Sequence, residues 1–138
     1  MLSAYPACFF KEGNLYSVIF PDFENGATCG DDMQDALEMA VNYLATRLFW
    51  IEKDEEQRPT PSDIKDVSPE SIAKDLDFKY DDVFVSMVTV DVNEYAKTHF
   101  NKAVKKTLSI PEWLNESAIA MGVNFSQVLQ EALMEKIK

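Results

Sequence analysis

The chain has 138 residues, enough for one ordinary domain or for a small domain with a dimerisation module. Because 46% of its residues are hydrophobic and 12% are aromatic, it can bury a core, which excludes disorder of the whole chain. The net charge of −11 is unevenly placed: residues 1–98 hold 8 Lys or Arg against 20 Asp or Glu, whereas residues 99–138 hold 5 against 4. The first part should therefore repel nucleic acid and attract a basic protein.

Two runs of aromatic and β-branched residues near the start predict a β-hairpin. The runs are residues 5–10 and 15–20, and the turn residues Gly13 and Asn14 lie between them. A third short strand is expected at residues 27–29.

A long helix is expected after Asp31 and Asp32, because acidic side chains stabilise the positive end of a helix. Apolar residues then recur at helical spacing. They are Leu37, Ala40, Val41, Leu44, Leu48 and Ile51, with Tyr43, Phe49 and Trp50 widening the same side. This helix should pack across the sheet.

Residues 52–63 are polar and contain two prolines, which predicts a loop. Ser68 and Pro69 then form the start of a short helix that reaches about Leu76. Residues 83–92 give the strongest strand pattern. Because both faces of this strand are apolar, we expect it in the interior of the sheet.

Residues 93–103 are expected to form a linking helix or hinge, which divides the chain into a first domain (1–98) and a second domain (99–138). The second domain should open with a short alternating strand at residues 105–110. Leu108 and Ile110 would point to one face of this strand, and the polar residues Lys105, Thr107 and Ser109 to the other. Such a polar face can read base edges in a major groove.

The residues after this strand predict two short helices. Pro111 suits a helix start, Gly122 suits the positive φ that ends a helix, and Asn124 with Gln127 forms a capping box. The apolar residues of both helices follow helical spacing. They are Trp113, Leu114, Ala118, Ile119 and Met121 in the first helix, and Val128, Leu129, Ala132, Leu133 and Ile137 in the second.

Residues 105–138 are too few to bury a stable core alone, but two copies can do so if their strands pair antiparallel. In its order of strand, helix and helix, the segment resembles the ribbon-helix-helix repressors. The dimer core is then expected to contain Leu108, Ile110, Trp113, Leu114, Val128 and Leu129. The alternative is a strand, turn and helix that merely complete the first domain.

The first 100 residues carry short motifs in a specific order. They are Tyr5-Pro6-Ala7, Tyr16-Ser17-Val18, Phe20-Pro21-Asp22, Gly26, Gly30-Asp31, Asp35-Ala36-Leu37, the loop with Pro59 and Pro61, and Val90-Asp91-Val92-Asn93-Glu94-Tyr95. Together with the ribbon-helix-helix segment, this series resembles the HicB antitoxins of type II toxin–antitoxin systems. The resemblance covers nearly the whole chain.

The resemblance implies an α+β fold, with an N-terminal, partial RNase H-like β-sheet and one long helix, followed by a ribbon-helix-helix (β-α-α) that dimerises by strand pairing. It implies an antitoxin that binds and masks a HicA-type toxin, a small mRNA-cleaving ribonuclease, and that represses its own operon by binding operator DNA. The expected partners are the toxin, the operator and a second copy, with higher-order assembly with the toxin left open. No enzymatic activity, cofactor or metal is expected of the chain itself.

Three segments depart from the usual HicB pattern. Asp22-Phe23-Glu24-Asn25-Gly26 replaces a turn that more often contains proline and cysteine. Lys106 stands where an apolar strand residue is common, and its stem can snorkel at the edge of the ribbon. Asn124-Phe125-Ser126 replaces a Ser-Arg-Ser type of helix start, so a phosphate-binding arginine is missing.

We expect Lys105, Thr107 and Ser109 to read bases, with Lys106 beside them. Asn124 is expected to anchor a phosphate at the start of its helix. For the strand residues the alternative is an exposed edge strand, and for Asn124 the alternative is an ordinary helix cap.

An acidic segment is the candidate surface for the toxin. Its residues are Asp22, Phe23, Glu24, Asp31 and Asp32. For Asp31 and Asp32 the alternative is helix capping, which explains at least one of them.

Two other functions stay open at this point. One is a ribbon-helix-helix repressor whose acidic first domain senses a small ligand. The other is a residual metal-dependent, RNase H-like nuclease, for which Asp22, Asp31, Asp35 and Asp91 would have to converge on two ions.

Zinc chemistry and export are not indicated. Cys8, Cys29 and His99, the only histidine, lack the spacing of a zinc site. No apolar run approaches the length of a membrane span, and the start of the chain has no features of a signal peptide. The two cysteines are expected to be reduced, which favours a cytoplasmic protein.

Overall fold

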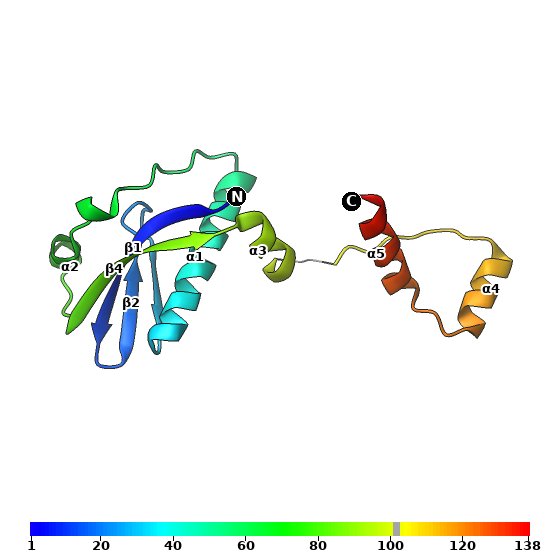
Figure 1. Cartoon of the computed structure of the whole chain (residues 1–138), viewed down its shortest axis with the longest axis horizontal. Helices are drawn as coiled ribbons and strands as arrows, with labels where there is room; N and C mark the ends of the chain where they lie inside the picture. Colours follow the sequence, from blue (N-terminus) through cyan, green and yellow to red (C-terminus); the bar gives the residue numbers. More distant parts are fainter. Residues whose placement is uncertain (101–102) are drawn as a thin grey trace. The chain divides into compact units, whose positions relative to one another are not determined.

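A computed structural model describes residues 1–100 and 103–138 of the chain (Figure 1). The chain divides into two compact units, Met1–Lys102 and Ala103–Lys138. The division falls after the expected boundary at residue 98, because Phe100 still packs on Phe49 of the first unit, with ring centroids 4.9 Å apart.

The described part of the first unit contains a four-stranded sheet, three α-helices and a 3₁₀ turn. The strands are β1 (Ser3–Glu12), β2 (Leu15–Ile19), β3 (Ala27–Gly30) and β4 (Asp82–Val90); the helices are α1 (Met33–Lys53), α2 (Pro69–Leu76) and α3 (Val92–His99), and the 3₁₀ turn is η1 (Ile64–Asp66). The expected hairpin, third strand, long helix and short helix after Ser68 are all confirmed.

The sheet is antiparallel, with the strand order β3-β2-β1-β4. The hairpin turn uses Gly13 at a φ of +63°, a conformation that glycine adopts without strain. The prediction of an interior position for β4 is wrong, since β4 pairs only with β1 and forms an edge of the sheet.

β4 is apolar on both faces because both faces of the sheet are covered there. On one face Val88 and Val90 are buried in the main core, which α1 covers. On the other face Val83 and Val85 pack in a second cluster with residues of α2 and the segment after it. The apolar sequence pattern therefore indicated that both faces of the strand are covered, but it did not indicate the position of the strand in the sheet.

The main core lies between the sheet and α1, which runs along one face of the sheet (Figure 1). The buried residues of α1 are Ala36, Ala40, Leu44, Ala45, Leu48 and Ile51. Leu37 and Trp50, expected on this face, are 42% and 56% exposed, and Val41 is only partly buried.

The reason for the shifted face is the close approach of α1 to the end of β3. A Cβ atom on Gly30 would lie 2.3 Å from the backbone nitrogen of Ala36 and 2.5 Å from its Cα. Only a small residue fits at such a contact, so Ala36 faces the sheet there and the neighbouring Leu37 turns outward.

The second unit contains α4 (Glu112–Ala120) and α5 (Phe125–Lys136). Gly122 has a φ of +69° between them, as expected for a residue that ends a helix. Asn124 caps α5 by accepting a hydrogen bond from the Gln127 backbone N–H at 3.1 Å. The capping box is half formed, because the Gln127 side chain donates to Glu131 instead.

Candidate protein and nucleic-acid interfaces

The second unit has almost no interior. None of residues 103–138 is buried. The predicted dimer-core side chains are accordingly open: Leu108, Trp113 and Val128 are 63%, 68% and 51% exposed, Ile110 and Leu114 are also exposed, and Leu129 is partly buried. So large an apolar surface on so small a unit marks a site of protein–protein contact.

The segment at residues 105–110 is not helical in the single chain, and no strand partner for it lies in the part of the chain that the structure describes. A β-strand is defined by pairing, so this segment cannot form one until a second strand lies beside it. Both faces of the segment are exposed, including the polar face with Lys105, Thr107 and Ser109, and Lys106 is exposed next to them.

The start of α5 offers a helix N-terminus at Asn124. Its side chain occupies the cap, and the backbone there is extended, with φ −83° and ψ 102°. The first turn of α5 contains no acidic residue that would repel a phosphate. Asn124 is thus an ordinary cap in this structure, and a cap of this kind leaves backbone N–H groups available to an anion.

The predicted acidic segment serves mainly to hold the first unit together. The Asp22 carboxylate accepts hydrogen bonds from the backbone N–H and the hydroxyl of Ser62, which joins two loops. Phe23 is only 5% exposed and packs against Tyr5, with ring centroids 4.8 Å apart. Phe23 is therefore a core residue in this unit, whereas Glu24 is exposed.

Asp31 and Asp32 stand at the start of α1, and their contacts are those of a helix cap. The Asp32 carboxylate accepts from the Asp35 backbone N–H at 2.8 Å, and the Asp35 carboxylate accepts from the Asp31 backbone N–H at 2.9 Å. Both residues remain exposed, so capping and an electrostatic contact with a basic partner are compatible.

Of the four candidate nuclease carboxylates, Asp31 and Asp35 lie together at the start of α1, and three of the four, Asp22, Asp35 and Asp91, accept hydrogen bonds from other groups. Asp22 binds Ser62, Asp35 binds the start of α1, and Asp91 caps α3 through the Glu94 backbone N–H. Within residues 1–100 and 103–138, no group of three or more His, Cys, Asp or Glu side chains is arranged to hold a metal ion.

The two cysteines and the histidine have different surroundings in the structure. Cys8 is buried in the second cluster, and burial raises the pKa of its thiol to about 11, whereas Cys29 is exposed. The His99 ring stacks on Tyr95 at a centroid distance of 3.8 Å within α3. No helix in the described ranges combines the length and apolar character needed to cross a bilayer.

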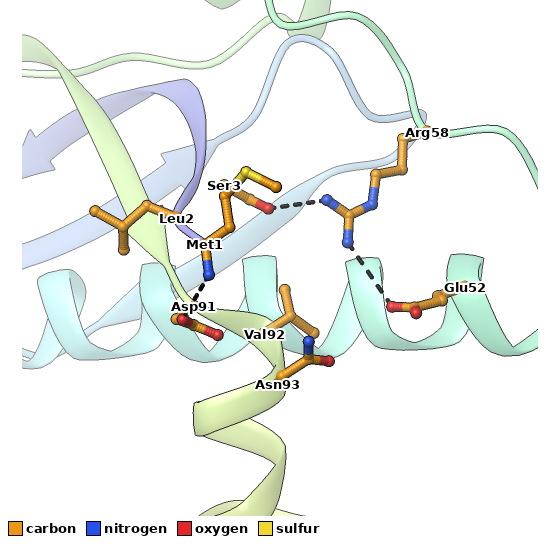
Figure 2. Close-up of a pocket in the computed structure, with 8 residues that line it drawn as sticks. All are labelled: Met1, Leu2, Ser3, Glu52, Arg58, Asp91, Val92 and Asn93. Atoms are coloured by element: carbon orange, nitrogen blue, oxygen red, sulfur yellow. Dashed lines mark hydrogen bonds and ion pairs between the residues drawn. The ribbon is translucent and has the colours of Figure 1, made fainter.

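A cavity of about 410 Å³ lies where β1, the end of α1 and the start of α3 meet (Figure 2). Its charged groups are paired with one another. The N-terminal ammonium contacts Asp91 at 2.9 Å, and Arg58 donates to the Ser3 hydroxyl at 2.8 Å and lies 3.9 Å from Glu52. These contacts tie the segment after α1 to the start of β1 and leave no unpaired charge among the lining residues to attract a ligand.

Comparison with known proteins places the chain in a class of small regulatory proteins. The family model described as the HicB-like antitoxin of bacterial toxin–antitoxin systems matches residues 5–132. The chain belongs to this HicB-like antitoxin family.

Individual relatives agree with this assignment. A protein named Antitoxin HicB 2, from Photorhabdus laumondii, is 36% identical over 58 residues, which span 42% of each chain, so the match covers less than half of that relative. A chain of a solved toxin–antitoxin complex from Streptococcus pneumoniae is 38% identical and covers 99% of both chains, with a TM-score of 0.66. The solved Burkholderia pseudomallei antitoxin HicB shares the fold, with a TM-score of 0.51 and 19% identity over 99% of both chains.

Proposed function

We propose that the chain is an antitoxin that masks a HicA-type ribonuclease toxin with its first unit and represses its own operon with its second. The observation that carries this proposal is the likeness, over 99% of the chain and at 38% identity, to a chain of a solved toxin–antitoxin complex. Because that likeness includes both units, it supports one protein with two joined roles.

Masking needs no chemistry from the antitoxin itself. The first unit, with its 20 acidic residues against 8 basic ones in residues 1–98, would cover a basic RNA-binding surface by charge complementarity and exclude the substrate. In this role the chain is not an enzyme, and it needs no cofactor. We assign the first unit to the partial RNase H-like sheet of this family, and we retain Glu24, Asp31 and Asp32 as exposed candidates for toxin contact.

The second units of two copies of the chain would together form a ribbon-helix-helix dimer. Their exposed apolar side chains on α4 and α5 would close over Leu108 and Ile110 when two copies pair residues 105–110. Pairing would also provide the strand that the single chain lacks. Complexes with the toxin could then contain two or more copies of each protein.

Operator binding would use the exposed polar face of that ribbon. We assign base contacts to Lys105, Thr107 and Ser109, further contact to Lys106, and a phosphate at the Asn124 cap. Residues 99–138 carry 5 basic and 4 acidic residues, so few phosphates would be neutralised and the affinity should depend only weakly on salt. Operator DNA would place this function in the cytoplasm.

We expect an adjacent reading frame to encode a small basic protein, and the proposal is tested by co-expressing the chain with that protein. We expect the two to co-purify, and we expect the chain to abolish RNA cleavage by that protein. Absence of a complex would contradict the antitoxin role. Metal-dependent RNA cleavage by the chain alone would instead indicate a nuclease, and release of the operator by a small molecule would indicate a ligand-sensing repressor.

A further inference from the structure

Strand β4 has a neighbour on one side only. Its nine residues pair with β1 from Ser3↔Val90 to Lys11↔Asp82, and β1 is in turn paired with β2. The other side of β4 is an edge of the sheet. The alternation of the antiparallel ladder decides which main-chain groups face that edge.

The hairpin fixes this alternation. A two-residue turn closes on a hydrogen-bonded pair, here Glu12↔Leu15, so Cys8, Phe10 and Glu12 direct their main-chain groups toward β2. The intervening residues of β1 direct theirs toward β4. The Lys11 carbonyl confirms this direction, since it accepts from the Asp81 N–H at 2.7 Å.

The main-chain groups of successive β4 residues therefore alternate in direction. Those of one residue are hydrogen-bonded to β1, and those of the next residue face the open edge. The main-chain groups of Asp82, Phe84, Ser86 and Val88, the partners of the β4-facing residues of β1, are used in the ladder. The main-chain groups of Val83, Val85, Met87 and Thr89 point to the open edge.

Two of these open groups find a partner in the strand itself. The Val83 N–H donates to the Asp82 carboxylate at 2.8 Å, and the Met87 carbonyl accepts from the Ser86 hydroxyl at 3.2 Å. Within the described residues, the N–H groups of Val85, Met87 and Thr89 have no protein acceptor. Three consecutive open donors on one edge are a template for another strand.

The sequence and register of β4 also lack several features that usually prevent strand addition, while η1 and α2 both contact this strand. The sequence Asp82-Val83-Phe84-Val85-Ser86-Met87-Val88-Thr89-Val90 contains no Lys, Pro or Gly, and its register with β1 is continuous, without a bulge. Proteins normally block such an edge with charges, prolines, bulges or a covering segment. An unblocked, β-branched edge of this length is therefore suited to bind an extended segment.

We propose that the open edge of β4 accepts an extended, basic segment of the toxin as an added strand. This inference rests on the proposed antitoxin function and names the surface that binds the toxin. Binding would be carried by main-chain hydrogen bonds to Val85, Met87 and Thr89, in addition to the charge attraction of the acidic unit.

Charge at the ends of the strand favours a basic partner over a second copy of this chain. Asp81 and Asp82 lie at one end of β4, and Asp91, whose carboxylate already contacts the N-terminal ammonium at 2.9 Å, lies at the other. If two copies paired through the whole open edge, Val83 would oppose Thr89 of the other copy, and Asp81 would then oppose Asp91. Like charges directly opposite each other destabilise a strand pair, whereas a basic residue opposite Asp81 or Asp82 would stabilise it.

Residue-resolved amide hydrogen exchange tests this proposal on the full chain, alone and bound to the basic protein from the adjacent reading frame. In the free chain the amides of Phe84, Ser86 and Val88 should exchange slowly, and those of Val85, Met87 and Thr89 quickly. In the complex, the second set should become protected as well. Full toxin binding without this protection would overturn the inference and leave the proposed function standing.

Other outcomes of the same experiment are equally decisive. If the protein from the adjacent frame does not bind at all, both the inference and the proposed function fail. If the open amides become protected in the free chain as its concentration rises, the occupant of the edge is a second copy, and the proposal of a toxin strand is wrong.

A matched pair of variants separates the main chain from the side chain. Met87→Pro removes one outward N–H and should weaken toxin binding by about tenfold or more. Met87→Ala keeps that N–H and should change binding by no more than about twofold. Equal weakening by both variants would contradict strand addition. Slow amide exchange at Ser86 and Val88 in the Met87→Pro variant would show that its sheet is still folded. If the variant does unfold, the exchange experiment on the unsubstituted chain still tests the proposal.

Discussion

Phe23 shows how one residue in an acidic segment can have a purely structural role. Its neighbours Asp22 and Glu24 are charged, and the sequence alone favoured a surface contact for the whole segment. The structure places the Phe23 ring in the main core, against Tyr5, Phe20 and Tyr43. The turn is anchored there because the Phe20 N–H donates to the Gly26 carbonyl at 2.7 Å.

We therefore predict that Phe23→Ala destabilises the first unit by about 3–5 kcal/mol, the usual effect of truncating a buried aromatic side chain. Glu24→Ala, at an exposed neighbouring position, should change the free energy of unfolding by less than about 0.5 kcal/mol. Urea unfolding of both variants measures the difference. Equal stability of the two would show that Phe23 does not belong to the core.

The two cysteines should differ sharply in reactivity. Only a thiolate reacts with an alkylating reagent, and burial raises the pKa of Cys8 to about 11 from its ordinary value of 9.0. At about pH 8 we expect Cys29 to be modified and Cys8 to be spared until the protein unfolds, as mass spectrometry would show. The folded state binds the Cys8 proton more tightly than the unfolded state does. The contribution of Cys8 to the free energy of unfolding should therefore be present below the ordinary pKa of 9.0 and decline as the pH rises toward about 11. Modification of Cys8 under native conditions would contradict its burial.

At the scale of elements, the segment at residues 105–110 and the strand β4 present opposite situations. The first has a strand pattern and no strand partner among residues 1–100 and 103–138, whereas the second has one partner and one open edge. In our proposals, another chain completes the main-chain hydrogen bonding of both segments.

Leu108→Asp should prevent dimerisation of the full chain, because it would place a carboxylate in the core shared by two copies. Analytical ultracentrifugation would show a monomer for this variant and a dimer for the unsubstituted chain. Thr107→Asp, on the opposite polar face, is the matched control and should remain dimeric. A stable Leu108→Asp dimer would refute the proposed pairing of residues 105–110.

At the scale of the whole molecule, the chain divides into two compact units. The first unit has its own core, whereas none of residues 103–138 is buried, and we propose that a second copy completes the second unit. Toxin neutralisation and operator binding should therefore respond to different substitutions.

Lys105→Ala combined with Thr107→Ala should abolish specific operator binding and leave toxin neutralisation unchanged, because the first unit contains neither residue. Mobility-shift assays with the operator and RNA-cleavage assays with the toxin measure the two activities in parallel. Loss of both would mean that toxin masking depends on the second unit.

Local chemistry was sufficient to predict most elements of this protein. Turn residues, caps and apolar spacing placed the hairpin, α1, α2, α4 and α5, since these features depend on residues close together in the chain. The order of motifs also indicated the HicB-like family, and the family match confirms it.

Only the tertiary structure determined which residues of these elements are buried and which strand lies at the edge of the sheet. The inward face of α1 depends on the contact between Gly30 and Ala36, and the burial of Phe23 depends on rings from distant segments. The edge position of β4 was invisible to a pattern of apolar residues, because that pattern reports covered faces and carries no information about the neighbours to which main-chain groups bond. Side-chain periodicity is local, whereas hydrogen-bond partners and close contacts are set by residues far apart in the sequence.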